Sequence, residues 1–268
     1  MNLETLLSDS IFYRNSYLRI ILLKIYHIII FSPLFWFRKG PKLIINGVPK
    51  SGTHLLTSVL NEIPFLVNTR YAISMWDINR VSMKNSYFED WNPSMHKFEK
   101  KLSKINGHQF MLSHLPYHKI LYKALKKNNI KMININRSSD DVLQSKYNYI
   151  NTLDRHFAHK TLKTFKGKSQ KINALKNGFK TEDGFILEKH ETVYGAFEPW
   201  KNYNDNFILN INFEELAGEK KGFSDKLRKN SILKILNFLN IESNEYLIDR
   251  IHNNASKTKS FTLRNFKN

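Results

Sequence analysis

The chain has no cysteine among its 268 residues. This absence excludes a disulfide framework, a cysteine-ligated metal site and a thiol nucleophile. It is typical of a reducing compartment, so we expect a cytoplasmic protein. The sequence also has no internal repeat and no helix-turn-helix, zinc-finger or RNA-binding signature. Nucleic acid is therefore not an expected partner, although the formal net charge is +19.

Acidic residues are few beside the basic ones, 23 against 42. Positions 155–180 contain no acidic residue, whereas basic residues recur there: Arg155, Lys160, Lys163, Lys166, Lys168, Lys171, Lys176 and Lys180. A basic surface of this kind attracts an anionic ligand or an anionic membrane. The alternative is a solvated loop whose lysines confer only solubility.

The N-terminal part of the chain differs in character from the rest. Residues 17–36 are strongly apolar, but three basic side chains interrupt the run: Arg19, Lys24 and His27. Such charges disfavour a membrane-spanning helix, and no small-residue cleavage site of a signal peptide is evident. The pattern predicts an amphipathic helix on the cytoplasmic surface of a membrane, and packing on the domain or on a partner is the next alternative. We expect 1–40 to be a separate apolar segment and 41–268 to be one domain.

A glycine-bearing turn at 47–54 joins an expected strand to an expected helix. Backbone N–H groups of such a turn, with the N-terminus of the following helix, bind phosphate. Lys50 lies inside the turn. Thr53 and His54 occupy the positions where an ATP- or GTP-binding loop has its lysine and its metal-binding hydroxyl. The turn therefore predicts a phosphate site beside Lys50 that lacks the usual metal ligand.

A second expected strand, 131–136, ends at Arg137. Asp141 follows four residues later and Ser145 eight residues later. A guanidinium presents a planar fork of donors to phosphate, and a serine hydroxyl adds one more donor. Asp141 favours a helix N-terminus at this point. The segment therefore predicts a second phosphate site at a strand end.

A third apolar run, 109–113, ends at His114, which Leu115 and Pro116 follow. The ordinary pKa of imidazole lies near neutral pH, which suits a general base. A histidine taken alone is more often a surface residue or a satisfied core residue. The assignment of His114 to catalysis therefore depends on the motifs around it.

Short apolar runs alternate with helical stretches; the runs lie near 42–47, 109–113, 130–136 and 206–212. This alternation predicts an α/β domain with a central parallel β-sheet flanked by helices. A chain of this length supplies one such domain with a sizeable core. Ligands of open α/β sheets bind beyond the carboxyl ends of the strands, and the three motifs all lie at such ends.

Together the motifs resemble those of sulfotransferases that use 3′-phosphoadenosine 5′-phosphosulfate (PAPS). The run 49–53, Pro-Lys-Ser-Gly-Thr, is similar to their 5′-phosphosulfate loop. The segment from Arg137 to Ser145 is similar to their 3′-phosphate motif, and His114-Leu115-Pro116 to the motif whose histidine removes the acceptor proton. The resemblance implies a P-loop-like fold, PAPS as co-substrate and no metal.

The resemblance also implies roles for individual residues. Lys50 and His114 would be catalytic. Tyr194 would lie near the adenine, and Arg264 would close over the 3′-phosphate. The implied cofactor-binding residues are Lys50, Ser51, Gly52, Thr53, His54, Arg137, Ser145, Tyr194 and Arg264. Asp77 is the next candidate for the base if His114 does not serve.

The chain departs from the family at three places. Leu112 stands where a lysine is common, Leu55 stands where an aromatic residue commonly stacks on adenine, and Asn265-Phe266 replace Lys-Gly near the C-terminus. These departures keep open a catalytically inactive, membrane-associated protein that binds polyanions. A nucleotide kinase with an altered P-loop is the other alternative.

The reaction that the resemblance implies is transfer of the sulfuryl group of PAPS to an acceptor hydroxyl or amine. The sequence does not identify the acceptor. An anionic glycan or glycolipid near a membrane fits the positive charge and the apolar N-terminal segment, while a small phenol or alcohol is the alternative.

Overall fold

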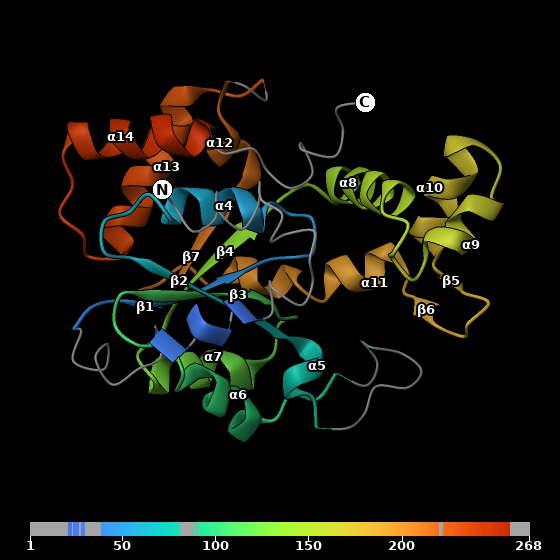
Figure 1. Ribbon diagram of the computed structural model, residues 1–268, viewed down its shortest axis with the longest axis horizontal. Coiled ribbons are helices and arrows are strands. Elements are labelled where there is room, and N and C mark those ends of the chain that lie inside the picture. Colours follow the sequence, from blue (N-terminus) through green and yellow to red (C-terminus); the bar gives the residue numbers. More distant parts are fainter. Residues whose placement is uncertain are drawn as a thin grey trace.

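Five parallel strands form a sheet through the centre of the protein (Figure 1). The computed structural model describes residues 21–22, 24–26, 28–29, 39–80, 88, 91–219 and 222–257. The strand order is β2-β3-β1-β4-β7, and each neighbouring pair is parallel. The strands are β1 (Lys42–Asn46), β2 (Val67–Ser74), β3 (Gln109–His114), β4 (Lys131–Asn136) and β7 (Ile208–Asn212). The predicted α/β fold with a central parallel sheet is confirmed.

Helices cover both faces of this sheet (Figure 1). On one face lie α4 (Thr53–Leu60), α12 (Phe213–Ala217), α13 (Asp225–Phe238) and α14 (Glu245–Lys257). On the other lie α6 (Met95–Leu102) and α7 (Lys119–Lys127). The short helix α5 (Met75–Ile78) directly follows β2, and the short helix η2 (Glu198–Asn202) precedes β7. Parallel strands covered on both faces read as continuous apolar runs, which is why the sequence showed them clearly.

The alternation of side chains along β1 divides the core in two. Leu43 and Ile45 belong to a cluster with residues of α4, α13 and α14. Ile44 belongs to a second cluster with residues of α6 and α7. All three are fully buried. Successive side chains of a strand point to opposite faces, so one short run anchors both helical layers and holds the end of β1 in place.

A smaller lobe, residues 139–195, extends from one end of the sheet (Figure 1). It comprises α8 (Ser139–Thr152), α9 (His159–Thr164), α10 (Gly167–Asn177), β5 (Phe179–Lys180), β6 (Ile186–Leu187) and α11 (His190–Gly195). The lobe has its own apolar cluster, in which Leu143 and Ile150 of α8 pack with Leu162, Leu175 and Leu187. The basic segment 155–180 therefore lies on folded helices and is not one continuous solvated loop.

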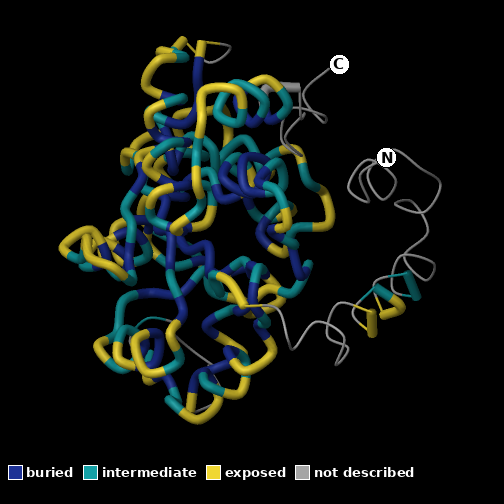
Figure 2. Tube along the Cα trace, turned by 90° about the vertical axis from the view of Figure 1, so that its left-hand side faces the viewer, coloured by how far each residue is buried: buried dark blue, intermediate teal, exposed yellow. Residues whose placement is uncertain are grey.

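The helical residues 21–22, 24–26 and 28–29 lie at the side of the protein body (Figure 2). Tyr26 Oη donates a hydrogen bond to the backbone oxygen of Asn68 at 2.5 Å. In the described part of the chain, no helix is long and apolar enough to cross a membrane. Most of 17–36 lies outside the described residues, so the membrane-surface helix and the boundary at residue 40 stay predictions.

Candidate functional site

The turn after β1 touches the ends of both neighbouring strands. Nδ1 of His114, at the end of β3, lies 2.7 Å from the backbone oxygen of Gly47. Nη1 of Arg137, directly after β4, donates to the backbone oxygen of Lys50 at 3.4 Å. Because β1 lies between β3 and β4, the strand order brings the three predicted motifs together. The roles assigned to the individual residues stay predictions.

The turn itself has a backbone that only certain residues tolerate. Ser51 N–H donates to Val48 O at 2.9 Å, and Lys50 and Gly52 have φ values of 80° and 112°. A Cβ on Gly52 would come within 2.5 Å of Phe213, and one on Gly47 within 2.5 Å of Ser51 Oγ. Both glycines are required because there is no room for a larger residue, and at Gly52 also because φ is positive.

The N-terminus of α4 is open to an anion. Gly52 precedes the helix, no side chain caps it, and no acidic residue occupies its first turn. The unpaired N–H groups and the helix dipole therefore favour a negative group at this point. This is the position that the sequence predicted for a phosphate.

Two buried polar atoms of the site have no hydrogen-bond partner among the described residues. They are Oγ of Ser51, a residue with no exposed surface, and Nε of Arg137. An unsatisfied buried polar group costs about 1–3 kcal/mol. Phosphate oxygens would accept from both groups, so the residues present fit the cofactor that the resemblance implies.

The two cations of the site lie on aromatic rings. Lys50 Nζ is 3.3 Å from the ring centroid of Tyr149 in α8, and the guanidinium carbon of Arg137 is 4.2 Å from that of Phe213. Burial lowers the pKa of Lys50 to about 8. An anion bound beside Lys50 would favour its charged form and raise this pKa again.

The contact of His114 with Gly47 determines which ring nitrogen is free. A carbonyl oxygen only accepts, so Nδ1 donates and Nε2 keeps its lone pair. Burial lowers the pKa of His114, the bond to Gly47 opposes this shift, and the charge of Lys50 adds to it. His114 is therefore neutral at pH 7, with Nε2 available as a proton acceptor.

His54 lies on the first turn of α4, and its side chain is exposed. The protein atoms around the ring nevertheless remove part of its hydration. This desolvation, followed by the charges of His114 and Lys50, lowers the pKa of His54 to about 4. The ring is therefore neutral at pH 7. Of the predicted cofactor residues in this turn, Thr53 and His54 offer backbone N–H groups to an anion, and Lys50 offers the charge.

A network of buried amides holds the end of β3 against β1. Asn46 Oδ1 accepts from Leu115 N–H at 2.8 Å and from Ser113 Oγ at 3.0 Å. Its Nδ2 donates to Leu115 O at 3.1 Å and to Asn134 Oδ1 at 3.3 Å. The network continues through Asn134 Nδ2 to Asn210 Oδ1 on β7, at 2.9 Å. It fixes the residues on either side of His114.

The second phosphate motif is only partly assembled. Ser138 Oγ accepts from Asp141 N–H at 3.2 Å and donates to Asp141 Oδ2 at 2.8 Å. These bonds cap α8, as the acidic residue predicted. Ser145 is half-buried in α8, and within the described residues no hydrogen bond joins it to Arg137.

Tyr194 lies beside Arg137, and hydrogen bonds within the protein already engage its hydroxyl. Tyr194 Oη donates to Arg137 O at 2.8 Å and accepts from Lys201 Nζ at 3.2 Å. Its side chain is buried. In this arrangement Tyr194 supports the strand end that carries Arg137. Arg264 lies outside the described residues.

Asp77, the alternative base, has a structural function. Its Oδ2 accepts from Ser74 N–H and Ser74 Oγ, both at 2.9 Å, and its Oδ1 lies 3.0 Å from Lys101 Nζ. Burial pushes the pKa of Asp77 up, but these hydrogen bonds and the charge of Lys101 outweigh it and lower the pKa. Asp77 is an ionised partner of the N-cap residue Ser74, and its carboxylate already accepts from Ser74 and Lys101. Within the described ranges, no group of three or more metal-ligating side chains is present.

Two of the departures from the family pattern share one location. Leu55 and Leu112 both pack against the apolar cluster beneath α4. The leucine that replaces a cation is therefore part of the core, and it contributes no charge to the site.

Sequence reasoning missed four side chains that shape the site: Asn46, Tyr149, Phe213 and Asn134. One signal was available, because asparagine alternates with isoleucine in 133–136 and 210–212 and ends β1. Polar residues with a period of two in otherwise buried strands indicate a buried polar network. No comparable signal indicated Tyr149 or Phe213.

The chain belongs to the sulfotransferase domain family, whose model matches residues 40–268. The resemblance seen in the motifs is thereby confirmed. The amine sulfotransferase of Oryctolagus cuniculus is 29% identical over 209 residues, which are 78% of this chain and 59% of the relative. The chain thus spans less than two thirds of that relative's length.

Solved structures with a similar course of the chain include mouse sulfotransferase SULT7A1 complexed with PAP and retinol dehydratase in complex with androsterone and inactive cofactor PAP. The first has a TM-score of 0.49 and 22% identity. The second has a TM-score of 0.47 and 13% identity. Each comparison covers 85% of this chain and 68% of the other chain.

Proposed function

We propose that this protein is a PAPS-dependent sulfotransferase that transfers the sulfuryl group to an acceptor hydroxyl or amine. The observation that carries the proposal is the meeting of Lys50, His114 and Arg137 at one end of the sheet. The unsatisfied Ser51 Oγ and Arg137 Nε support it, because both suit phosphate oxygens. Membership of the sulfotransferase domain family supports the same chemistry.

The residues of the site divide the work. The N–H groups at the start of α4 and the ammonium of Lys50 would hold the 5′-phosphosulfate and stabilise charge on the leaving phosphate. Arg137 and Ser145, together with Arg264, would hold the 3′-phosphate. His114 Nε2 would take the acceptor proton. The bond from sulfur to the phosphate oxygen breaks as the bond from sulfur to the acceptor atom forms, and adenosine 3′,5′-bisphosphate (PAP) leaves.

Calorimetry with PAP and ATP tests the cofactor assignment. We expect PAP to bind far more tightly than ATP. Arg137→Ala should weaken PAP by about 2–3 kcal/mol, the scale of a lost charge-assisted bond, and should weaken 5′-AMP much less. Arg155→Ala is the matched control, because Arg155 is an exposed arginine on the lobe. Equal or tighter binding of ATP would refute the assignment.

We further propose that the acceptor is an anionic glycan or glycolipid and that the N-terminal segment attaches the protein to the cytoplasmic face of a membrane. Ile25, Ile28 and Ile29 are 50%, 73% and 55% exposed. Their spacing of three and four residues places them on one side of a helix. An exposed apolar face of this kind, next to the exposed Lys24, suits the interface of an anionic bilayer.

Co-sedimentation with vesicles tests this attachment. Vesicles that contain phosphatidylserine should bind the protein, neutral vesicles should bind less, and added salt should weaken the binding. Deletion of residues 1–38 should release the protein and leave PAP affinity unchanged, because the cofactor motifs begin at residue 47. No sedimentation of the full chain would contradict the attachment and would favour packing of the segment on the domain.

A further inference from the structure

A row of aromatic rings leads from Lys50 along the lobe to the surface. Tyr149, which lies under Lys50 Nζ, meets His156 edge to face with ring centroids 5.7 Å apart. Phe157 stacks on His156 at 4.7 Å, and Phe185 follows at 5.8 Å. Phe157 and Phe185 are 43% and 52% exposed, so the outer end of the row is open to solvent.

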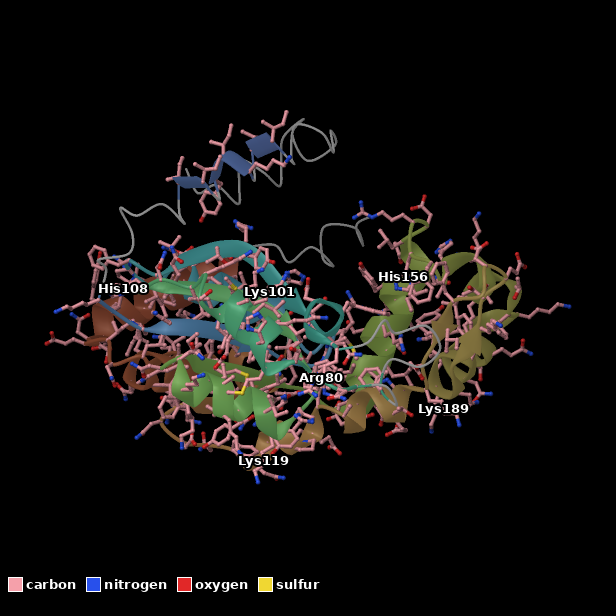
Figure 3. The ribbon with its side chains drawn as sticks, turned by 90° about the horizontal axis from the view of Figure 1, so that it is seen from below. Arg80, Lys101, His108, Lys119, His156 and Lys189 are labelled. Carbon is pink, nitrogen blue, oxygen red and sulfur yellow. The ribbon has the colours of Figure 1, made fainter. Side chains whose placement is uncertain are left out.

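His156 follows α8 on the lobe (Figure 3), and the local turn determines its tautomer. The backbone N–H of Ala158 donates to His156 Nδ1 at 3.1 Å. A backbone N–H only donates, so Nδ1 keeps its lone pair and Nε2 carries the proton of the neutral ring. The turn is held in place by His159, whose Nδ1 donates to Ile150 O at 2.7 Å. His156 therefore offers a hydrogen-bond donor.

Lys146 lies one turn before Tyr149 on the same face of α8, because residues three apart are neighbours on a helix. It is half-buried, and burial lowers its pKa to about 8, with the charge of Glu188 acting in the opposite direction. After burial, the charges of Lys146 and Lys50 lower the pKa of His156 to about 4. The positive charges of both lysines therefore act on a neutral imidazole that donates.

Lys50, Lys146 and His156 are all hydrogen-bond donors here, and Glu188 is the acidic group whose charge acts on Lys146. Lys50 serves the cofactor under the proposed function, which leaves Lys146 and His156 beyond it on the side of the lobe. An anion at this position would satisfy the N–H of His156 and stabilise the charged form of a partly desolvated lysine. The aromatic row beside it offers flat apolar contact to a ring.

We propose that Lys146 and His156 form a subsite for an anionic group of the acceptor, so that the preferred substrates carry a carboxylate, sulfate or phosphate besides the hydroxyl or amine that is sulfated. The inference rests on the proposed sulfotransferase function and adds a specificity determinant to it. Lys146 acts here as a point charge that selects the acceptor, and it takes no part in moving the proton.

Matched acceptors that differ only in charge test the subsite. One pair is 4-hydroxyphenylacetate with 4-hydroxyphenylacetamide, and the other is methyl glucuronide with methyl glucuronamide. Wild-type protein should prefer the anionic member of at least one pair, measured as kcat/KM. Comparison of the aromatic pair with the sugar pair shows whether the carboxylate is recognised on an aromatic acceptor or on a sugar.

Lys146→Met retains most of the length of the side chain and removes its charge. It should lower kcat/KM for the anionic member about tenfold or more relative to the neutral member, as expected for a lost charge-assisted bond. Lys146→Arg should restore most of the preference. Lys168→Met is the control, because Lys168 is an exposed lysine 5.9 Å from the ring of Tyr147 on the same lobe. Lys168→Met should leave kcat/KM unchanged for both the anionic and the neutral acceptor.

Binding measurements separate failure of the subsite from failure of the proposed function. PAP affinity should be the same in wild type and Lys146→Met, and loss of PAP binding by wild type would overturn the proposed function itself. If neither acceptor pair is turned over, calorimetry of the same compounds with the PAP-loaded protein gives the answer. Equal binding of charged and neutral members, or an equal loss of both in Lys146→Met, would overturn the subsite.

Discussion

The carboxyl ends of the inner strands β3, β1 and β4, here called the sheet edge, position one histidine, and the lobe positions another. They do so in opposite ways. His114 is held by Gly47, which is 67 residues away in the sequence. His156 is held by Ala158 in a turn of its own chain segment. Both rings are neutral at pH 7, but His114 presents a lone pair and His156 presents a proton. The difference indicates that the proton acceptor depends on the assembled sheet, whereas the donor on the lobe depends on local structure.

The surroundings of the two histidines differ in the same sense. Amides of β1, β4 and β7 and the hydroxyl of Ser113 on β3 lie beside His114, and hydrogen bonds among them join neighbouring strands. Aromatic rings and lysines surround His156, mostly from α8 and the turn after it. A rigid polar network suits a reaction whose geometry is constant. Exposed aromatic and cationic side chains suit recognition, which can change without disturbing that geometry.

The largest expected effect comes from removal of the proposed general base, His114, at the carboxyl end of β3. His114→Ala should lower turnover by about 10²–10⁴-fold, the usual contribution of a general base. PAP affinity should remain nearly intact, because under the proposed function His114 acts on the acceptor and not on the cofactor. Turnover assays and calorimetry check both statements, with His96→Ala, an exposed histidine on α6, as the control. A variant that retains more than a third of normal turnover would clear His114 of this role.

The pH dependence sharpens the comparison, because Lys50 and Lys146 share a pKa of about 8. The rate constant kcat/KM for PAPS reports groups of the free enzyme. It should fall as pH rises through about 8, since Lys50 loses its charge there. On the acid side it should hold below pH 6.5, because the pKa of His114 is lowered from that ordinary value. The basic limb for PAPS should persist in Lys146→Met; its loss there would assign it to the lobe.

The smallest change in chemistry tests the amide network. Asn46→Val removes the acceptor of Leu115 N–H and the donor to Asn134 Oδ1. Leu115 O keeps Trp200 Nε1 as a donor, and Ser113 Oγ keeps Ile45 O as an acceptor. Each orphaned buried group should lower the free energy of unfolding by about 1–3 kcal/mol. Urea denaturation measures this. Asn237→Ala, an exposed position on α13, should stay within about 0.5 kcal/mol of wild type.

The same variant also separates stability from positioning. If the network orients His114, Asn46→Val should lower kcat more than it raises KM for PAPS, even well below the denaturation midpoint. A drop in stability with unchanged kcat would show that the network supports the fold alone.

Much of the fold and part of the site followed from the sequence. The buried apolar runs predicted the parallel sheet, because strands that helices cover on both faces contain apolar residues in succession. The turn 47–54, Arg137 and His114 lay at strand ends, so the parallel arrangement alone required that they share one edge. The acidic residue after Arg137 correctly predicted the start of α8.

Other features depended on contacts between distant segments. Asp77 had the right residue type for a base, but only the structure showed that Ser74 and Lys101 occupy its carboxylate. Tyr194 lies near the predicted site, yet its hydroxyl holds the backbone of Arg137.

By itself, the sequence determined the strands, the glycines of the turn and the residue types that meet at the sheet edge. Only the tertiary structure decided which ring lies under Lys50, which nitrogen of His114 is free, and that the ring of His156 meets Tyr149. The physical reason is that periodicity and strand ends are local properties of the chain. A tautomer, a stacked ring or a desolvated lysine depends on the atoms that the fold brings in from elsewhere.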